Sequence, residues 1–284
     1  MQLSRRSVLA WGGGALAGLF PATARADGAS GEALNSPRCV RAPQARGERP
    51  GDEELGVGRN GEFCAYPLRM MAFHRVVNDH LGGPPILVTY DSTSSVGRVF
   101  DPVLAGKPYA FEAASAEQGL PMLRDRQTGS RWSALTGRCL SGPLKGKEMG
   151  LIPSLILTWE RWQGLHADSW VLAEQAALSA HYTARVTAAT CRLAPAVPAA
   201  VLQKVEGPLK PDALVIGLNA GGKQVALSLP TADEAASARN LKLGRTKLAL
   251  FSDPAARTVA AYHREVEGRP LRFAVATQED GAPL

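Results

Sequence analysis

The chain has 284 residues, of which 45% are hydrophobic and 20% are charged, and its formal net charge is +6. This size allows a sizeable apolar core, in one large domain or in two small ones. Three arginines and no acids lie in the first 26 residues, so the rest of the chain carries a net charge of only +3. Because no lysine or arginine stripe stands out there, we expect no nucleic-acid partner.

Residues 1–26 have the features of an export signal. Arg5 and Arg6 precede a short, glycine-diluted apolar segment, and Ala24-x-Ala26 supplies a cleavage pattern. Paired arginines ahead of such a segment are typical of twin-arginine signals. We predict a signal peptide over residues 1–26 and a periplasmic or secreted protein, with an uncleaved anchor as the alternative. No other stretch approaches the roughly 20 apolar residues of a spanning helix, so no transmembrane span is expected after signal removal.

Short strands and turns are predicted after the signal. Residues 27–52, rich in Gly, Pro, Arg and Glu, are expected to be extended or disordered. Asn60-Gly61 indicates a two-residue hairpin, because a type I′ turn needs positive φ at both central positions. The segment LRMMAFHR after Pro67 predicts a helical turn or two. Residues 74–79 and 85–91 are then expected as paired strands, and Asp91 begins a polar turn.

The middle of the chain favours hairpins followed by helical segments. Residues 120–146 alternate apolar and polar side chains between Gly and Pro turns. Trp159 and Trp162 stand at helical i, i+3 spacing, and we expect them to pack in the core. The alanine-rich run 171–189 is a further helix candidate, and a proline-punctuated connection follows it.

The chain matches itself at a shift of 161 residues. Residues 55–68 align with 216–229, and the match extends to Tyr90; residues 100–111 align with 262–273 after one inserted residue. We predict an internal duplication, with repeats at 55–115 and 216–277 and a helical segment at 231–239. At this shift the polar residues His74, Asn78, Asp79 and Asp91 meet Ala235, Arg239, Asn240 and Ser252. We therefore expect any polar site in the first repeat alone.

These patterns predict a mainly β fold, with a β-rich α+β fold as the alternative. Duplicated hairpin and meander units are expected, with short helices in the connection between them. We expect a single β-rich domain over residues 53–278.

Four motifs carry a resemblance to a known family: AYPL (65–68), VVND (76–79), DRQTGSRW (125–132) and GPLKG (142–146). Over roughly residues 55–275 the chain resembles the exported bacterial family called domain of unknown function 3179. The resemblance implies an exported globular domain without an assigned reaction. Members commonly carry a Cys-Pro-Leu-Cys-like run after the VTY strand, whereas this chain has Asp91, Ser92, Thr93 and Ser94 there. A copper or dithiol role is therefore not expected at these positions.

Two groups of polar side chains are candidates for a ligand site. The first is His74, Asn78, Asp79 and Asp91, which gather at one end of a sheet if their segments form paired strands. The second follows in the DRQTGSRW motif: Asp125, Arg126, Thr128, Ser130 and Trp132. The alternative for both groups is structural, with side chains that bond to turn backbone.

Metal binding and disulfides both stay open. Cys64, Met70 and His74 form a candidate soft-metal set, because thiolate, thioether and imidazole ligands suit copper. Core packing is the alternative, and no second histidine at ligand spacing supports a zinc site. The four cysteines Cys39, Cys64, Cys139 and Cys191 allow three disulfide pairings that sequence cannot separate. A protein exported in the folded state does not require them, so free thiols are equally compatible with this sequence.

The sequence contains no hydrolase elbow, zinc-protease, phosphate-loop or dinucleotide motif. We predict an exported periplasmic protein that binds a small ligand or an envelope partner in a cleft of the first repeat. Two alternatives are kept: a periplasmic enzyme that uses His74 with Asp79 or Asp91, and a copper-binding protein. The sequence defines neither the ligand nor the oligomeric state.

Overall fold

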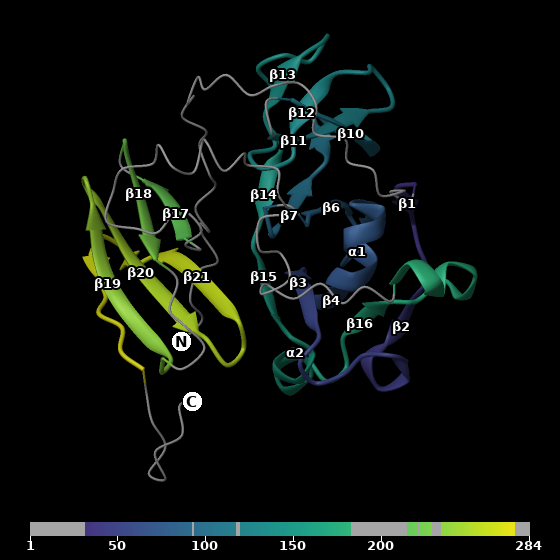
Figure 1. The fold of residues 1–284 in the computed structure, drawn as a ribbon. Coiled ribbons are helices and arrows are strands. Elements are labelled where there is room, and N and C mark those ends of the chain that lie inside the picture. Colours follow the sequence, from purple (N-terminus) through teal and green to yellow (C-terminus); the bar gives the residue numbers. More distant parts are fainter. Residues whose placement is uncertain are drawn as a thin grey trace, which may run out of the picture. The chain divides into compact units, whose positions relative to one another are not determined.

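The computed structural model describes residues 32–92, 94–117, 120–182, 215–220, 222–228 and 234–275. The fold is β-rich, as predicted, with short helices between the strands (Figure 1). Residues 32–182 belong to one compact unit, the N-terminal unit, and residues 215–275 to another, the C-terminal unit. The sequence had led us to expect one domain over residues 53–278. The predicted signal peptide lies outside the described residues.

The first sheet of the N-terminal unit is built around a hairpin. Its strand order is β15 (Ser154–Thr158), β3 (Glu53–Arg59), β4 (Glu62–Pro67), β16 (Trp170–Leu172) and β2 (Cys39–Arg41). Between β3 and β4, Asn60 and Gly61 have φ values of 51° and 86°. Positive φ at both positions is what a type I′ turn requires, so the predicted hairpin is confirmed.

The second sheet follows directly in the chain. Its order is β1 (Leu34–Asn35), β5 (Val76–His80), β6 (Pro85–Asp91), β7 (Val96–Asp101) and β14 (Gly150–Ile152). Helix α1 (Leu68–His74) connects the two sheets and ends at Arg75, which has a left-handed φ of 64°. The helix after Pro67 and the pairing of β5 with β6 are confirmed. His74 is the last residue of α1, however, and not part of a strand, because β5 begins at Val76.

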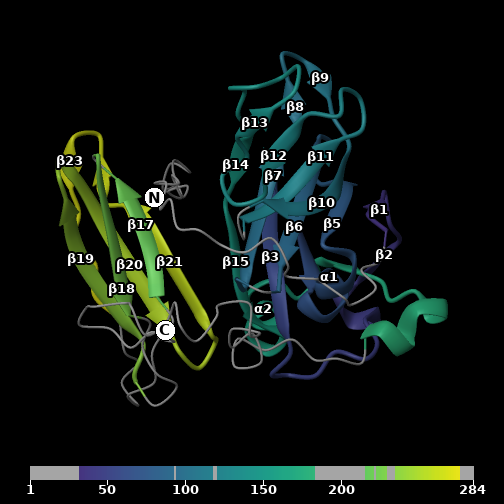
Figure 2. The same cartoon turned by 45° about the horizontal axis from the view of Figure 1, so that its top comes forward.

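A third sheet contains the predicted hairpins of the middle segment. It has the order β10 (Phe111–Glu117), β11 (Leu120–Asp125), β12 (Arg131–Ser133) and β13 (Cys139–Ser141), and the small hairpin β8 (Val103–Leu104) and β9 (Lys107–Pro108) precedes it (Figure 2). Helix α2 (Trp159–Leu165) confirms the predicted helix at the two tryptophans. Its N-cap is Thr158, whose side chain accepts a bond from the amide of Arg161.

Two segments of the N-terminal unit differ from expectation. The alanine-rich run 171–189 was predicted as a helix, but its first residues belong to strand β16, and a 3-10 helix, η2 (Ala176–Tyr182), follows. Pairing with β2 and β4 overrides the helix propensity of this run. Residues 27–52 were expected to be extended or disordered. Their described part, residues 32–52, contains the extended strands β1 and β2 and also the 3-10 helix η1 (Ala42–Gln44).

The second sheet is buried on both faces. Val77, Val88 and Val99 join a core with the first sheet and α1, which we call the inner core. The alternate residues, such as Leu87 and Phe100, pack in another core against the third sheet. This two-sided burial explains why β6 is a continuous apolar run and not an alternating one. On the far face of the first sheet, Trp159 and Trp162 pack in a smaller core, which confirms the role expected for them.

The C-terminal unit is entirely β in its described part. It contains the hairpin β17 (Val215–Ala220) and β18 (Lys223–Ser228), the three-stranded sheet β19 (Ser237–Leu243), β20 (Thr246–Asp253) and β21 (Thr258–His263), and the small hairpin β22 (Glu265–Val266) and β23 (Arg269–Pro270). The helix predicted over 231–239 is wrong for residues 237–239, because they pair in β19. Residues 231–233 lie outside the described part.

The two units share one order of strand pairing. In the first hairpin Gly56 pairs with Ala65, and the residues 161 positions later pair in the same way in β17 and β18. In the next sheet Asn78 pairs with Leu87, and here the matching residues lie 162 positions later, in β19 and β20. The same offset of 162 holds for β6 with β7 and for the small hairpins.

The offset between the paired strands thus changes from 161 to 162 residues before β19, whereas the sequence match keeps an offset of 161 as far as Tyr90. The position matters because a shift of one residue within a strand exchanges the two faces of the sheet. By strand pairing, Asn78 corresponds to Asn240, Asp79 to Leu241 and Asp91 to Asp253. A constant shift of 161 residues gave Arg239, Asn240 and Ser252 as the counterparts. Each of these lies one residue before the counterpart given by strand pairing.

Candidate functional site

A hollow lies in the N-terminal unit, beside α1. Its volume is about 410 Å³, and it is lined by Gly47, Arg49, Arg69, Glu174, Ser179, Ala180 and Tyr182. These residues come from the segment that precedes β3, from α1, and from the chain around η2. The volume is within the range of pockets that bind small molecules.

Arg69 holds the wall of this hollow together. It lies in the first turn of α1, with only 10% of its side chain exposed, and it forms ion pairs with Glu48 and Glu174. Its Nη1 atom donates to Oε2 of Glu174 at 2.8 Å. Burial alone lowers the pKa of Arg69, but the bonds to the two carboxylates outweigh it and raise the pKa overall. The guanidinium is therefore fixed in place and permanently charged.

A buried carboxyl group lies behind Arg69. Glu54 is fully buried, and neither of its oxygens has a partner; the Oε2 atom of Glu48 also has none. Burial raises the pKa of Glu54 well above its usual value, and the neighbouring charge of Glu48 adds to the effect. A proton on Glu54 gives two of these three oxygens a partner, because the acid then donates to Glu48. Burial and the neighbouring Glu48 therefore both favour the protonated form of Glu54.

Tyr182 is oriented by His74. The Nδ1 atom of His74 lies 2.8 Å from the carbonyl oxygen of Glu32, which only accepts, so Nδ1 carries the ring proton. Burial lowers the pKa of His74, so the ring is neutral and its Nε2 accepts. The hydroxyl of Tyr182, 2.7 Å from Nε2, must then be the donor. Burial raises the pKa of Tyr182 to about 12, which keeps the proton on the phenol.

The hollow thus offers both donors and acceptors. With its proton committed to His74, the oxygen of Tyr182 has only lone pairs to offer to another molecule, and the carboxylate of Glu174 is also an acceptor. The Arg49 side chain supplies charged donors, and within the described ranges it forms no ion pair. Such a site suits a small molecule that carries an acidic group and a hydrogen-bond donor.

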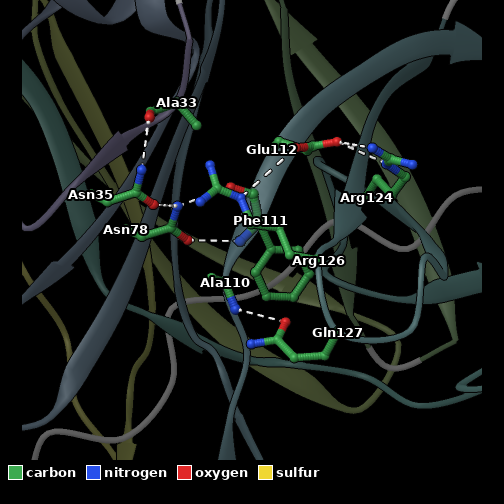
Figure 3. Close-up of polar contacts among 9 residues, drawn as sticks. All are labelled: Ala33, Asn35, Asn78, Ala110, Phe111, Glu112, Arg124, Arg126 and Gln127. Atoms are coloured by element: carbon green, nitrogen blue, oxygen red, sulfur yellow. Dashed lines mark hydrogen bonds and ion pairs between the residues drawn. The ribbon is translucent and has the colours of Figure 1, made fainter.

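Of the residues predicted from the sequence, Asn78 is part of a backbone clamp. Its Nδ2 donates to the carbonyl of Phe111 and its Oδ1 accepts from the amide of Phe111, both at 2.8 Å. Figure 3 shows Asn78 between Phe111 and Asn35, whose Oδ1 is 3.0 Å away. Arg126, also drawn there, forms an ion pair with Glu112.

The DRQTGSRW motif forms its own buried network. Asp125 is completely buried and accepts bonds from the amide and hydroxyl of Thr128 and from Nε1 of Trp132. Ser130 contacts the hydroxyl of Thr128 at 2.6 Å and accepts from the amide of Leu144. These contacts close the turn between β11 and β12 and join it to the GPLKG turn.

The first candidate group is divided among separate networks. His74 contacts Tyr182 and Glu32, whereas Asp79 accepts from the hydroxyl of Tyr66 at 2.8 Å. Asp91 accepts from the amide and hydroxyl of Ser94, as a turn-forming aspartate does, so the predicted turn is confirmed. Thr93 lies outside the described residues.

The candidate metal ligands Cys64, Met70 and His74 do not come together as a metal site in the described part of the chain. Cys64 and Met70 are both buried in the inner core, and both ring nitrogens of His74 have protein partners. Across the described ranges, no group of three or more His, Cys, Asp or Glu side chains is placed to hold a metal ion. Cys39, Cys64 and Cys139 are free thiols, and Cys191 falls outside those ranges.

The residues of the hollow were missed by sequence analysis. Arg69 is more than 100 residues away from Glu174 and Tyr182 in the chain, and no motif connects them. No sequence pattern singled out Glu54 either, because it directly follows two other acids, Asp52 and Glu53.

The comparisons with known proteins agree with the motifs. The family model described as "Protein of unknown function (DUF3179)" matches residues 33–283, nearly the whole chain. No curated protein and no solved structure matches the chain. No helix in the described ranges is long and apolar enough to cross a membrane. The extent of the family match leaves one conclusion: this chain belongs to the family Protein of unknown function (DUF3179).

Proposed function

We propose that this protein binds a small amphoteric solute in the hollow beside α1. The ligand carries an acidic group, bound by Arg49, and a donor such as an ammonium or hydroxyl group, bound by Tyr182 and Glu174. The observation that carries the proposal is the orientation of Tyr182, whose hydroxyl proton is held by His74 so that its lone pairs remain for a ligand. Fixed acceptors of this kind give a polar pocket its specificity.

The test is a binding screen on the purified full chain. Amino acids, hydroxy acids, dicarboxylates and alkyl amines are compared by thermal shift and then by calorimetry. We expect stabilisation by compounds with both an acid and a donor, and affinity lowered about tenfold or more in Arg49→Ala. The backbone of Arg49, not its side chain, bonds to Asp52, so the variant keeps that contact.

Arg46 provides the matched control. It is exposed and lines a different hollow, of about 200 Å³, so Arg46→Ala removes the same charge without touching the proposed site. Equal loss of affinity in both variants would show that only the general charge matters. Failure of every compound in the screen to bind contradicts the proposal.

We also propose export through the twin-arginine pathway. The support is the pair Arg5 and Arg6, the weakly apolar segment and the Ala24-x-Ala26 pattern. The mature protein should then begin at Asp27, which amino-terminal sequencing of material from the producing cell measures. Replacement of both arginines by lysine should retain the precursor inside the cell, and continued export of that variant contradicts the proposal.

We propose, finally, that the two units arose by duplication. The support is the shared order of strand pairing and a second asparagine clamp, in which Asn240 bonds to the amide and carbonyl of Phe273. The clamp partners are 33 residues apart in both units. An experimental structure tests this, since residues 53–111 and 215–273 should superimpose strand by strand.

A further inference from the structure

The hollow beside α1 presents two opposite charges that do not pair with each other. Arg49 and Glu174 both line it, and no ion pair joins their side chains in the part of the chain that the structure describes. Glu174 pairs with Arg69 instead. A hollow that offers a positive group and a negative group separately is complementary to a molecule that carries both charges itself.

Arg69 cannot balance both of its carboxylate partners. Its guanidinium carries one positive charge, whereas Glu48 and Glu174 carry one negative charge each, and Glu54 adds none in the protonated form that its burial favours. The Glu48 side chain is 4% exposed and the Glu174 side chain is 30% exposed. Because an unpaired charge costs most where it is most buried, Arg69 chiefly balances Glu48. The excess negative charge therefore falls on Glu174, at the wall of the hollow.

One oxygen of Glu174 is left for a ligand. Its Oε2 atom accepts from Nη1 of Arg69 at 2.8 Å, which fixes the carboxylate, and within the described ranges its Oε1 atom has no hydrogen-bond partner. Tyr182 likewise offers only lone pairs, since its proton is directed to His74. A ligand group that meets these two acceptors must donate. The best match is a group with several donors, a positive charge and no lone pair.

A protonated amine has these properties, and a hydroxyl group does not. An ammonium nitrogen has three N–H donors and no lone pair, whereas a hydroxyl has a single hydrogen, no charge, and lone pairs that would face other acceptors. Charge-assisted hydrogen bonds are also roughly twice as strong as neutral ones. We infer that the donor of the ligand is a protonated amine, so that the bound solute is a zwitterion with an amine and an acid, and that Glu174 selects it. This inference rests on the proposed binding of a small amphoteric solute in the same hollow.

The test compares matched pairs of compounds by calorimetry on the full chain. The members of each pair differ only in an amine or a hydroxyl group: alanine and lactate, β-alanine and β-hydroxypropionate, γ-aminobutyrate and γ-hydroxybutyrate. The series also varies the separation between the acid and the donor. In the pair whose length fits the hollow, we expect the amine to bind at least about tenfold more tightly than the alcohol.

Glu174→Gln tests the selecting residue. The amide keeps the size of the side chain and an oxygen for Arg69, but it removes the negative charge, so we expect the preference for the amine to fall below about threefold. Glu174→Asp keeps the charge and should keep the preference, although the affinity falls. Glu160→Gln is the matched control, because Glu160 is exposed in the first turn of α2 and does not line the hollow. Its preference should equal that of the parent chain.

The comparison within each pair stays valid in the parent chain if Glu174→Gln fails to fold. Equal affinity of the amine and the alcohol in every pair that binds overturns this inference but leaves the proposed function in place, since both compounds then occupy the hollow. A full preference for the amine in a folded Glu174→Gln variant overturns the role of Glu174, as does an equal loss of preference in Glu160→Gln. If no member of any pair binds, the proposed function fails together with this inference.

Discussion

The side-chain amide of Asn78 forms two hydrogen bonds with the backbone of Phe111, one as donor and one as acceptor. Phe111 begins β10 and is completely buried, so these bonds attach the third sheet to strand β5 of the second. Asn240 and Phe273 repeat the arrangement in the C-terminal unit, with bonds of 2.7 and 3.0 Å.

Removal of this clamp should destabilise the protein. In Asn78→Ala both backbone groups of Phe111 lose their partner, and each buried unpaired group costs about 1–3 kcal/mol. We expect the free energy of unfolding to fall by about 2–4 kcal/mol in urea titrations. Asn35→Ala, which removes only two exposed bonds, to Asn78 and to the carbonyl of Ala33, should cost less than about 1 kcal/mol. Equal losses of unfolding free energy in the two variants would show that the clamp stabilises the fold no more than the exposed bonds do.

Gly56 should not tolerate a side chain. A Cβ atom there would lie 2.1 Å from Cζ3 of Trp162, whose ring packs on the glycine. Because Trp162 is buried, Gly56→Ala should lower the unfolding free energy by about 2–3 kcal/mol. Thermal unfolding measures the loss, and Trp162→Phe in the same chain should recover part of it. Purely additive effects in that double-mutant cycle would contradict the contact.

The buried acid predicts an unusual pH dependence. The folded-state pKa of Glu54 is raised above its ordinary value of 4.5, so the folded protein binds the extra proton, and stability is lost as pH rises through that raised pKa. Glu54→Gln retains an amide donor for Glu48 and cannot ionise. We expect it to be more stable than the parent by about 1–3 kcal/mol at alkaline pH and no more stable near pH 4. A pH-independent difference contradicts the assignment of the proton.

His74 predicts the opposite slope. Its folded-state pKa is lowered from 6.5 by burial, so below that pH the unfolded chain binds a proton that the folded chain does not. Stability should fall as pH drops below about 6.5 and level off below the folded pKa. His74→Gln should flatten this part of the profile in unfolding titrations at about pH 5, 6 and 7. An unchanged slope would show that His74 is not the group responsible.

Local features of the fold could be predicted where a few neighbouring residues decide the conformation. Asn60 and Gly61 fix their turn through positive φ, and Asp91 caps its turn through Ser94. The run 171–172 could not be assigned, because its strand exists only through pairing with β2 and β4, which lie more than 100 residues earlier. Long-range pairing overrides local propensity there.

The candidate hollow depends on tertiary structure even more strongly. His74 was recognised as a polar residue of interest, but its actual partner, Tyr182, is 108 residues away. The motif residues Asp125 and Thr128 turned out to bond with each other, which spacing alone could not distinguish from binding to a ligand. Residues close in sequence mostly satisfied local turns, and the side chains around the hollow came from distant segments.

The position of β16 also determines when the N-terminal unit can form. This strand inserts between β4 and β2 and pairs with both, so the first sheet combines residues 39–41 with residues 170–172. A nascent chain shorter than about 172 residues cannot complete it, however stable the hairpin of β3 and β4 is. Loops of this length make closure slow, and fragments released early in synthesis would expose the edge of β4 to aggregation.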